Sequence, residues 1–230
     1  MKKPRESNAT VRPQQRADLS GVAQERTPPL PDAPYLPGHS TREDRRRALA
    51  FLDAVLPDDP KVPTSPTDWH GDPAWRLGVH LFHHGYFWEA HEAWERLWRR
   101  CAPGSEEREL LHVLLQYSAS ALHYRCGRFH AARDVALRAA ERLRKLRERG
   151  TKKVMGLGLA RLAKRLDRHI AAAEQAPGKH SARVPRVQRL PFSRDNPLIQ
   201  RTLGTSRNTQ GPSQKFSTRP SVRKNASSCR

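Results

Sequence analysis

Residues 85–98 are Gly-Tyr-Phe-Trp-Glu-Ala-His-Glu-Ala-Trp-Glu-Arg-Leu-Trp, and this stretch decides the fold class. Its main apolar residues recur every three or four positions, which is the period of an amphipathic α-helix. They are Tyr86, Ala90, Ala93, Trp94 and Leu97. The sequence therefore predicts a helix that begins immediately after Gly85 and buries one face.

A second stretch repeats this pattern. Each copy has a glycine, a phenylalanine two residues later and an alanine three residues after that. These are Gly85, Phe87 and Ala90 in the first copy and Gly127, Phe129 and Ala132 in the second. In both copies the glycine can take a left-handed turn between two helices, and the aromatic residue can fill the elbow. We therefore expect an all-α fold, a compact bundle of two antiparallel helical hairpins plus a C-terminal helix.

Capping residues, prolines and glycines give the limits of the helices and of the domain. The predicted helices cover residues 73–85, 86–100, 105–125, 129–149 and 154–175. They form a predicted helical domain over residues 69–176. Residues 1–68 are expected to be a mostly disordered arm with a possible short helix over 41–56, which Thr41 can cap with Asp44 three residues on.

The formal charge of +20 is unevenly distributed. Residues 177–230 carry twelve Lys and Arg against one acid, a net charge of +11, and are expected to be a disordered basic tail. Such a tail attracts polyanions, including nucleic acid, because binding releases counterions. Its aromatic residues are only Phe192 and Phe216, which argues against base-specific recognition.

Cysteine content and hydropathy suggest a compartment. The three cysteines show no metal-site spacing and fit reduced thiols. The first residues are polar, which argues against a secretory signal, and no apolar run approaches the roughly 20 residues that span a bilayer. We expect a cytoplasmic protein without a membrane span.

The most promising site motif is a histidine and a glutamate one helical turn apart. His91, Glu95 and Trp98 follow an i, i+4, i+7 spacing along the border of the apolar face. A partly desolvated imidazole and carboxylate can hold a proton, orient a substrate or bind a metal. The second copy of the repeat has Arg133 and Leu137 at the corresponding positions, so the hairpin geometry does not require the pair.

The helix over 105–125 offers a second polar stripe, formed by His112, Gln116, Ser120 and His123. If the two stripes face each other, their side chains converge. The predicted ligand-binding residues are His91, Glu92, Glu95, Trp98, Gln116 and His123. Among them His91 and Glu95 are the catalytic candidates, and His91, Glu95 and His123 are the candidates for a divalent metal.

Taken together, these residues resemble a known family. The quoted pattern is Leu81-Phe82-x-x-Gly85-Tyr86-x-x-Glu89-Ala90-His91-Glu92-x-x-Glu95-x-x-Trp98, then Gln116, and then Gly127-x-x-x-Ala131-Ala132. It is similar to the bacterial and archaeal family called domain of unknown function 309, whose hallmark H-x-x-x-E-x-x-W corresponds here to His91, Glu95 and Trp98. The resemblance implies a small all-helical bundle and no particular activity.

Several functions stay open on this basis, including whether the protein is an enzyme. The polar stripe can be a hydrogen-bond network that locks two helices together, a small-ligand or catalytic pocket, or a metal site. Alternatively, the basic tail and the last helices form a polyanion-binding or nucleic-acid-binding module. A helical-hairpin scaffold for a protein partner is the third alternative.

Overall fold

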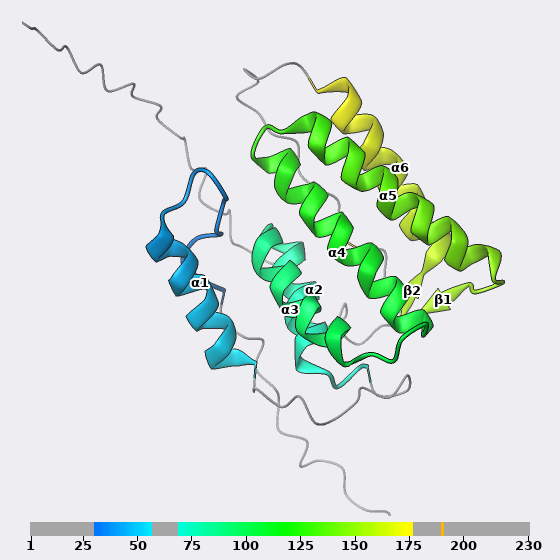
Figure 1. The fold of residues 1–230 in the computed structure, drawn as a ribbon, viewed down its shortest axis with the longest axis horizontal. Coiled ribbons are helices and arrows are strands. Elements are labelled where there is room, and N and C mark those ends of the chain that lie inside the picture. The colour runs from blue at the N-terminus through cyan, green and yellow to red at the C-terminus, as the bar shows by residue number, and fades with distance from the viewer. Residues whose placement is uncertain (1–29, 57–68, 177–189, 191–230) are drawn as a thin grey trace, which may run out of the picture.

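The structure is a computed structural model that describes residues 30–56, 69–176 and 190. Within these residues, six helices and one short hairpin follow each other (Figure 1). They are α1 (Arg42–Val55), α2 (Pro73–His83), α3 (Phe87–Arg100), α4 (Glu106–Arg125), α5 (Phe129–Glu148), β1 (Lys153–Val154), β2 (Leu157–Gly158) and α6 (Leu159–Gln175). The predicted all-α class is confirmed.

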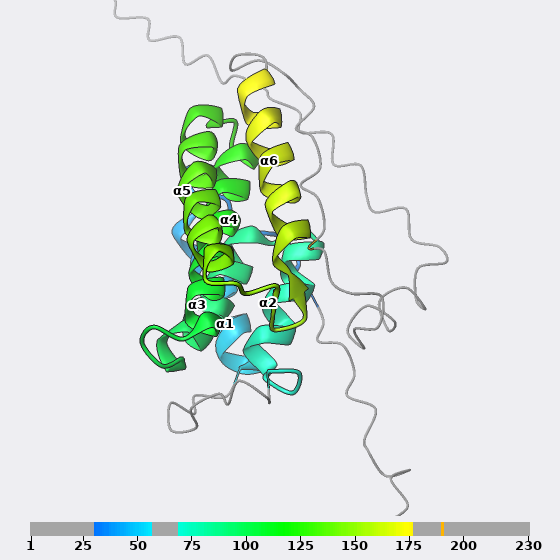
Figure 2. The same cartoon turned by 90° about the vertical axis from the view of Figure 1, so that its right-hand side faces the viewer.

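The two hairpins of the repeat are α2 with α3 and α4 with α5, and α6 packs against α5 (Figures 1 and 2). Gly85 and Gly127 have φ of +85° and +73°, as expected for glycines between antiparallel helices. The helix starts also follow the sequence. Asp72 accepts a hydrogen bond from the Trp75 backbone and Ser105 accepts one from that of Arg108.

The start of the last helix was predicted wrongly. The chain forms a two-stranded antiparallel hairpin first, with Val154 paired to Leu157, and α6 begins only at Leu159. Met155 and Gly156 make its turn with φ of +44° and +74°. Two consecutive residues with positive φ are typical of a tight β-hairpin turn, and they cannot belong to a right-handed helix.

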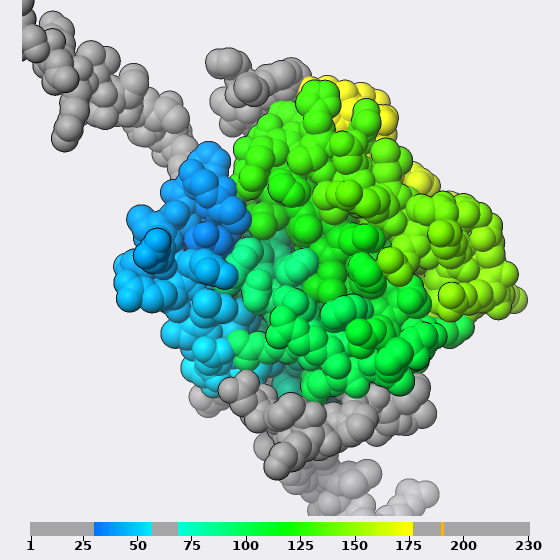
Figure 3. Space-filling view, viewed as in Figure 1, coloured from blue at the N-terminus to red at the C-terminus, as the bar shows by residue number. Residues whose placement is uncertain are grey.

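Helix α1 lies within residues 41–56, where the sequence predicts a short helix. Thr41 and Asp44 form a reciprocal capping box at its start. The helix packs beside α3, where Asp53 forms an ion pair with Arg96, and residues 30–56 lie as one layer against the helices that follow (Figure 3). Most of the predicted disordered arms lie outside the described residues, so those predictions stay untested. Leu190 is described; its side chain is buried and its amide donates to His83 Nε2.

The core between α2, α3 and α4 is built from aromatic rings. The ring of Phe82 lies 5.6 Å from that of Trp94 and 5.2 Å from that of Tyr117, and Trp75 lies 6.4 Å from Trp94. Trp75, Trp94 and Tyr117 are fully buried. No described helix has the length and apolar character needed to cross a bilayer.

We expect Gly78→Ala to destabilise the fold by about 2–4 kcal/mol, because overpacking a filled core is costly. A Cβ at Gly78 would lie 2.7 Å from Cε2 of Trp94, inside van der Waals contact. Urea unfolding measures the loss. Gly158→Ala is the control, since its Cβ meets no atom closer than 4.0 Å, and it should cost under about 1 kcal/mol. Equal costs for the two variants would contradict the close approach of Trp94 to α2.

Candidate functional site

Helix α3 positions most of the predicted site. Its inner face is formed by Ala90, Ala93, Trp94 and Leu97, which have no exposed surface. This burial fixes the rotation of the helix, since an amphipathic helix turns its apolar stripe to the core. His91, Glu92, Glu95 and Trp98 are consequently half-buried at the border of that stripe.

His91 reaches across from α3 to α4. Its Nδ1 lies 3.0 Å from the Leu115 carbonyl oxygen and 3.2 Å from Ser118 Oγ. The Ser118 hydroxyl itself donates to the Leu115 carbonyl, so the protonated Nδ1 is the group that donates to this pair of oxygens. His91 therefore joins two helices by hydrogen bonds, which is the polar-network alternative of the sequence analysis.

The two glutamates of the motif differ in their surroundings. Glu95 accepts a hydrogen bond from Arg99 at 2.7 Å within α3. Burial raises the pKa of Glu92, and the nearby carboxylate of Glu95 raises it too, whereas His91 and two arginines act against the rise. Neither carboxylate has a hydrogen bond to another predicted site residue among the described residues.

Trp98 holds the turn between α3 and α4. The Arg108 guanidinium lies 4.0 Å from the centre of its indole ring, and Arg108 also donates to the carbonyls of Trp98 and Cys101, each at 2.9 Å. A cation over an indole face is a stabilising contact. The rings of Trp98 and His112 also pack edge-on, with 5.9 Å between their centres. Trp98 is thus occupied by contacts within the bundle.

Gln116 lies in a groove between α4 and α5. The groove has a volume of about 520 Å³, and its lining includes Leu137, Arg138 and Lys145. Gln116 Oε1 is buried and has no hydrogen-bond partner among the described residues. Such an unpaired acceptor costs free energy unless a further molecule supplies a donor.

The residues of the second polar stripe do not form one site. Ser120 turns into the core, where its Oγ donates to the Ala132 carbonyl at 2.6 Å and meets His169 Nε2 at 2.8 Å. Burial lowers the pKa of His169 to about 4, so this imidazole is neutral at pH 7. Burial also lowers the pKa of His123, whose Nδ1 has no partner among the described residues.

The six predicted ligand-binding residues therefore do not form one hydrogen-bonded cluster. Within the described part of the chain, no hydrogen bond or ion pair joins any two of them. The same residues include no group of three or more His, Cys, Asp or Glu side chains placed to hold a metal ion. The ligand and metal assignments stay predictions.

One buried carboxylate was missed by the sequence analysis. Glu89 has no exposed surface, and its Oε1 accepts a hydrogen bond from the Tyr35 amide at 2.7 Å. Its Oε2 has no partner among the described residues. Glu89 lies four and eight residues before the buried Ala93 and Leu97, and this spacing was the signal that could have revealed it.

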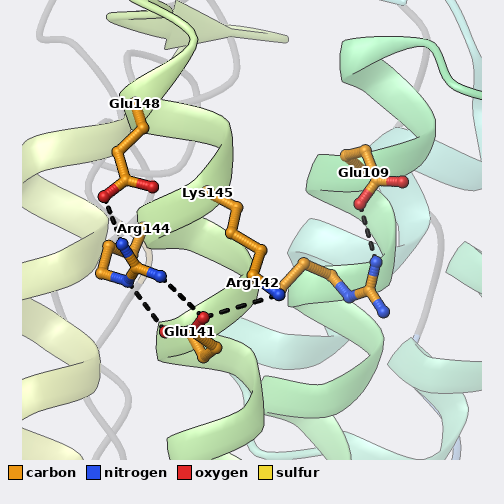
Figure 4. Close-up of polar contacts among 6 residues, drawn as sticks. All are labelled: Glu109, Glu141, Arg142, Arg144, Lys145 and Glu148. Carbon is orange, nitrogen blue, oxygen red and sulfur yellow. Dashed lines mark hydrogen bonds and ion pairs between the residues drawn. The ribbon is translucent and has the colours of Figure 1, made fainter.

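The net positive charge of the described helical domain lies in its second part, residues 129–176. Residues 69–128 carry seven Lys and Arg against seven Asp and Glu, whereas residues 129–176 carry thirteen against five, a net charge of +8. Figure 4 shows that cations of α5 are partly neutralised. Arg144 bridges Glu141 and Glu148, Lys145 also reaches Glu141, and Arg142 pairs with Glu109 of α4.

Other exposed cations of this part have no ion pair with a described residue. They are Arg138, Arg147, Arg149, Lys152, Lys153, Arg161, Lys164 and Arg168. Most lie at the end of α5, on β1 and along α6. We call seven of these residues the basic end of the domain: Arg147, Arg149, Lys152, Lys153, Arg161, Lys164 and Arg168.

Comparison with known proteins supports the family resemblance. Residues 75–135 match the model of the family described as Domain of unknown function (DUF309). The match covers most of α2, all of α3 and α4 and the start of α5, and it includes all six predicted site residues. No curated protein and no solved structure matches the chain.

The contacts of His91 predict a measurable contribution to stability. His91→Ala removes the hydrogen bonds between α3 and α4 and should lower the free energy of unfolding by about 1–2 kcal/mol. Glu95→Ala removes only a surface pair within α3 and should change it by less than about 0.5 kcal/mol. Urea unfolding of both variants tests this difference, and a larger loss for Glu95→Ala would contradict it.

Proposed function

We propose that this protein is a helical binding module that holds a polyanion, with the nucleic-acid phosphate backbone as the ligand class to test. The observation that carries the proposal is the separation of charge. The described domain is neutral over residues 69–128 and has a net charge of +8 over residues 129–176. A one-sided distribution of this kind orients the module toward a negatively charged partner.

Helix α6 gives the basic end a regular surface. Arg161, Lys164 and Arg168 are exposed and follow an i, i+3, i+7 spacing, so they lie along one side of the helix. The seven residue steps from Arg161 to Arg168 extend about 10 Å, which is close to the axial rise of three phosphates on one DNA strand at about 3.4 Å each. Contacts to successive phosphates need no base recognition.

The basic tail predicted at residues 177–230 would add to this surface, but it lies outside the described residues. The proposal therefore rests on the residues of α5, β1 and α6. We expect binding that depends steeply on salt and little on base sequence, because it arises from counterion release.

The test is a triple variant of the full-length protein, Arg161→Gln, Lys164→Gln and Arg168→Gln. We expect at least fivefold weaker binding of a fluorescein-labelled 20-base-pair DNA duplex at 50 mM salt. The slope of log K against log salt concentration should fall by about 2–3, close to one unit per lost phosphate contact. Fluorescence anisotropy measures both quantities.

The matched control removes the same charge elsewhere. Arg42, Arg46 and Arg47 are exposed on α1, so replacing all three by Gln lowers the net charge by the same amount. This variant should bind within twofold of the wild type. Equal weakening in both triple variants would assign the effect to overall charge, and no binding by the wild type at low salt would exclude the polyanion function.

A small-ligand site is a second candidate, supported by the unpaired Gln116 Oε1 in the groove between α4 and α5. Because Gln116 Oε1 is an acceptor, the ligand must supply a hydrogen-bond donor. The exposed Leu137 and the cation Arg138 on the same groove suit an apolar body and a carboxylate, so a hydroxy acid has all three groups. Of the six residues of the predicted site, this proposal uses Gln116.

Gln116→Leu separates a ligand role from a structural one. Because it removes an unpaired buried acceptor, the variant should be as stable as the wild type or about 1 kcal/mol more stable. Titration with 4-hydroxybenzoate, whose hydroxyl can donate to Gln116 Oε1, should shift the side-chain amide of Gln116 in the ¹H–¹⁵N NMR spectrum of the wild type. Backbone amides around the groove should also shift in the wild type, and these shifts should be absent in Gln116→Leu. Identical shifts in both proteins would remove Gln116 from the site.

A further inference from the structure

Residues 30–40 form a strap across the start of α3 and the end of α4. Tyr35 donates its amide to Glu89 Oε1 at 2.7 Å, and the Tyr86 hydroxyl donates to the Pro31 carbonyl at 2.8 Å. The Arg128 guanidinium donates to the Pro37 carbonyl at 3.3 Å. In all three contacts the strap contributes main-chain atoms and the helical domain contributes side chains.

Recognition through main-chain atoms is how proteins hold extended peptides. The strap has the composition of such a ligand, since prolines at 31, 34 and 37 fix φ and lower the entropy lost on binding. Gly38, with a φ of +87°, turns the chain after the last of these prolines. One side chain anchors it, because the Tyr35 ring packs edge-on against Trp88 with 4.8 Å between ring centres.

We propose that Tyr86, Glu89 and Arg128 form a receptor site for an extended, proline-containing peptide, which the chain's own residues 31–37 occupy and which the same sequence in another molecule can enter. The receptor side chains lie within residues 75–135, the part that matches the family model, whereas the strap precedes that part. Receptor and occupant are 54 positions apart at the contact between Tyr35 and Glu89.

The present occupant satisfies the receptor only in part. Glu89 has no exposed surface, yet the strap supplies a donor to Oε1 and none of the described residues supplies one to Oε2. A buried carboxylate with one free oxygen is costly. Release of the strap would give Oε2 access to water, so the unpaired oxygen favours exchange of the strap.

The charges around Glu89 make the exchange depend on pH. Burial raises the pKa of Glu89 to about 7, and Glu92 of α3 raises it further, whereas the amide of Tyr35 and the guanidinium of Arg125 on α4 oppose the rise. Burial raises the pKa of Tyr86, and the carboxylates of Glu89 and of Asp32 on the strap add to the rise, whereas Arg125 opposes it.

The sign of the effect follows from the direction of this shift. An exposed glutamate has a pKa near 4.3, so covering Glu89 raises its pKa and favours the protonated form. The covered state is then most stable below about pH 4.5, loses stability as the pH rises toward 7, and changes little above that.

The first experiment uses the full-length protein with Tyr35→Pro, which removes the amide hydrogen that Glu89 accepts and the ring that contacts Trp88. The probe is a fluorescein-labelled peptide of residues 30–40. At pH 6 we expect Tyr35→Pro to bind it at least tenfold more tightly than the wild type, whose site is occupied. Tyr35→Phe keeps the amide and the ring and should behave as the wild type.

Adding Glu89→Ala to Tyr35→Pro should abolish peptide binding. If Tyr35→Pro does not bind the peptide, or if binding survives the loss of Glu89, the receptor site is wrong. Circular dichroism establishes that each variant keeps its helices, so that loss of binding is not loss of fold.

A second measurement needs no added peptide. Hydrogen exchange of residues 30–40 in the wild type, corrected for intrinsic rates, should show protection about 100-fold greater at pH 5 than at pH 8. In Glu89→Gln the protection should not vary with pH. Asp53→Asn, which alters the ion pair of α1 with Arg96 and leaves the strap contacts in place, should keep the wild-type profile. Protection that is independent of pH in the wild type would overturn the role of Glu89.

Discussion

The close approach of α2 and α3 depends on one contact, the indole of Trp94 against the backbone of Gly78. No other residue type leaves room for the ring at this position. The contact brings Trp94 within reach of Trp75 and Phe82 and fixes the rotation of α3 about its axis. Because the rotation is fixed, Glu89 must enter the interior and His91 must face α4. The burial of Glu89 and the orientation of His91 toward α4 are thus consequences of the aromatic packing of Trp94 on the same helix.

The sequence predicted those parts of the fold whose determinants are local. Capping residues gave the starts of α1, α2 and α4, and the two glycines gave the hairpin elbows. The β1–β2 turn was missed because Met155, a residue with no preference for positive φ, adopts that conformation beside Gly156. Helical periodicity continues across such a short turn and conceals it.

The candidate site was predictable only as far as single helices determine it. The position of His91 at the border of α3 followed from the period, and its hydrogen bonds to α4 agree with a network between helices. Convergence with Gln116 and His123 required the rotation of α4 and the position of α5, which depend on packing far along the chain. Ser120 shows the difficulty, since its hydroxyl is paired with His169 of α6.

Helix α5 joins the strap site to the basic end of the domain. It begins beside Arg128, which holds the strap, and ends beside Arg147 and Arg149. Helix α6 then returns along α5, so that His169, the neighbour of Arg168, packs against Tyr124 at the end of α4. The cations Arg161, Lys164 and Arg168 therefore form a track that leads from the far end of the bundle back toward the strap. A polyanion that followed this track would approach the peptide site, so that the occupant of one surface would alter binding at the other.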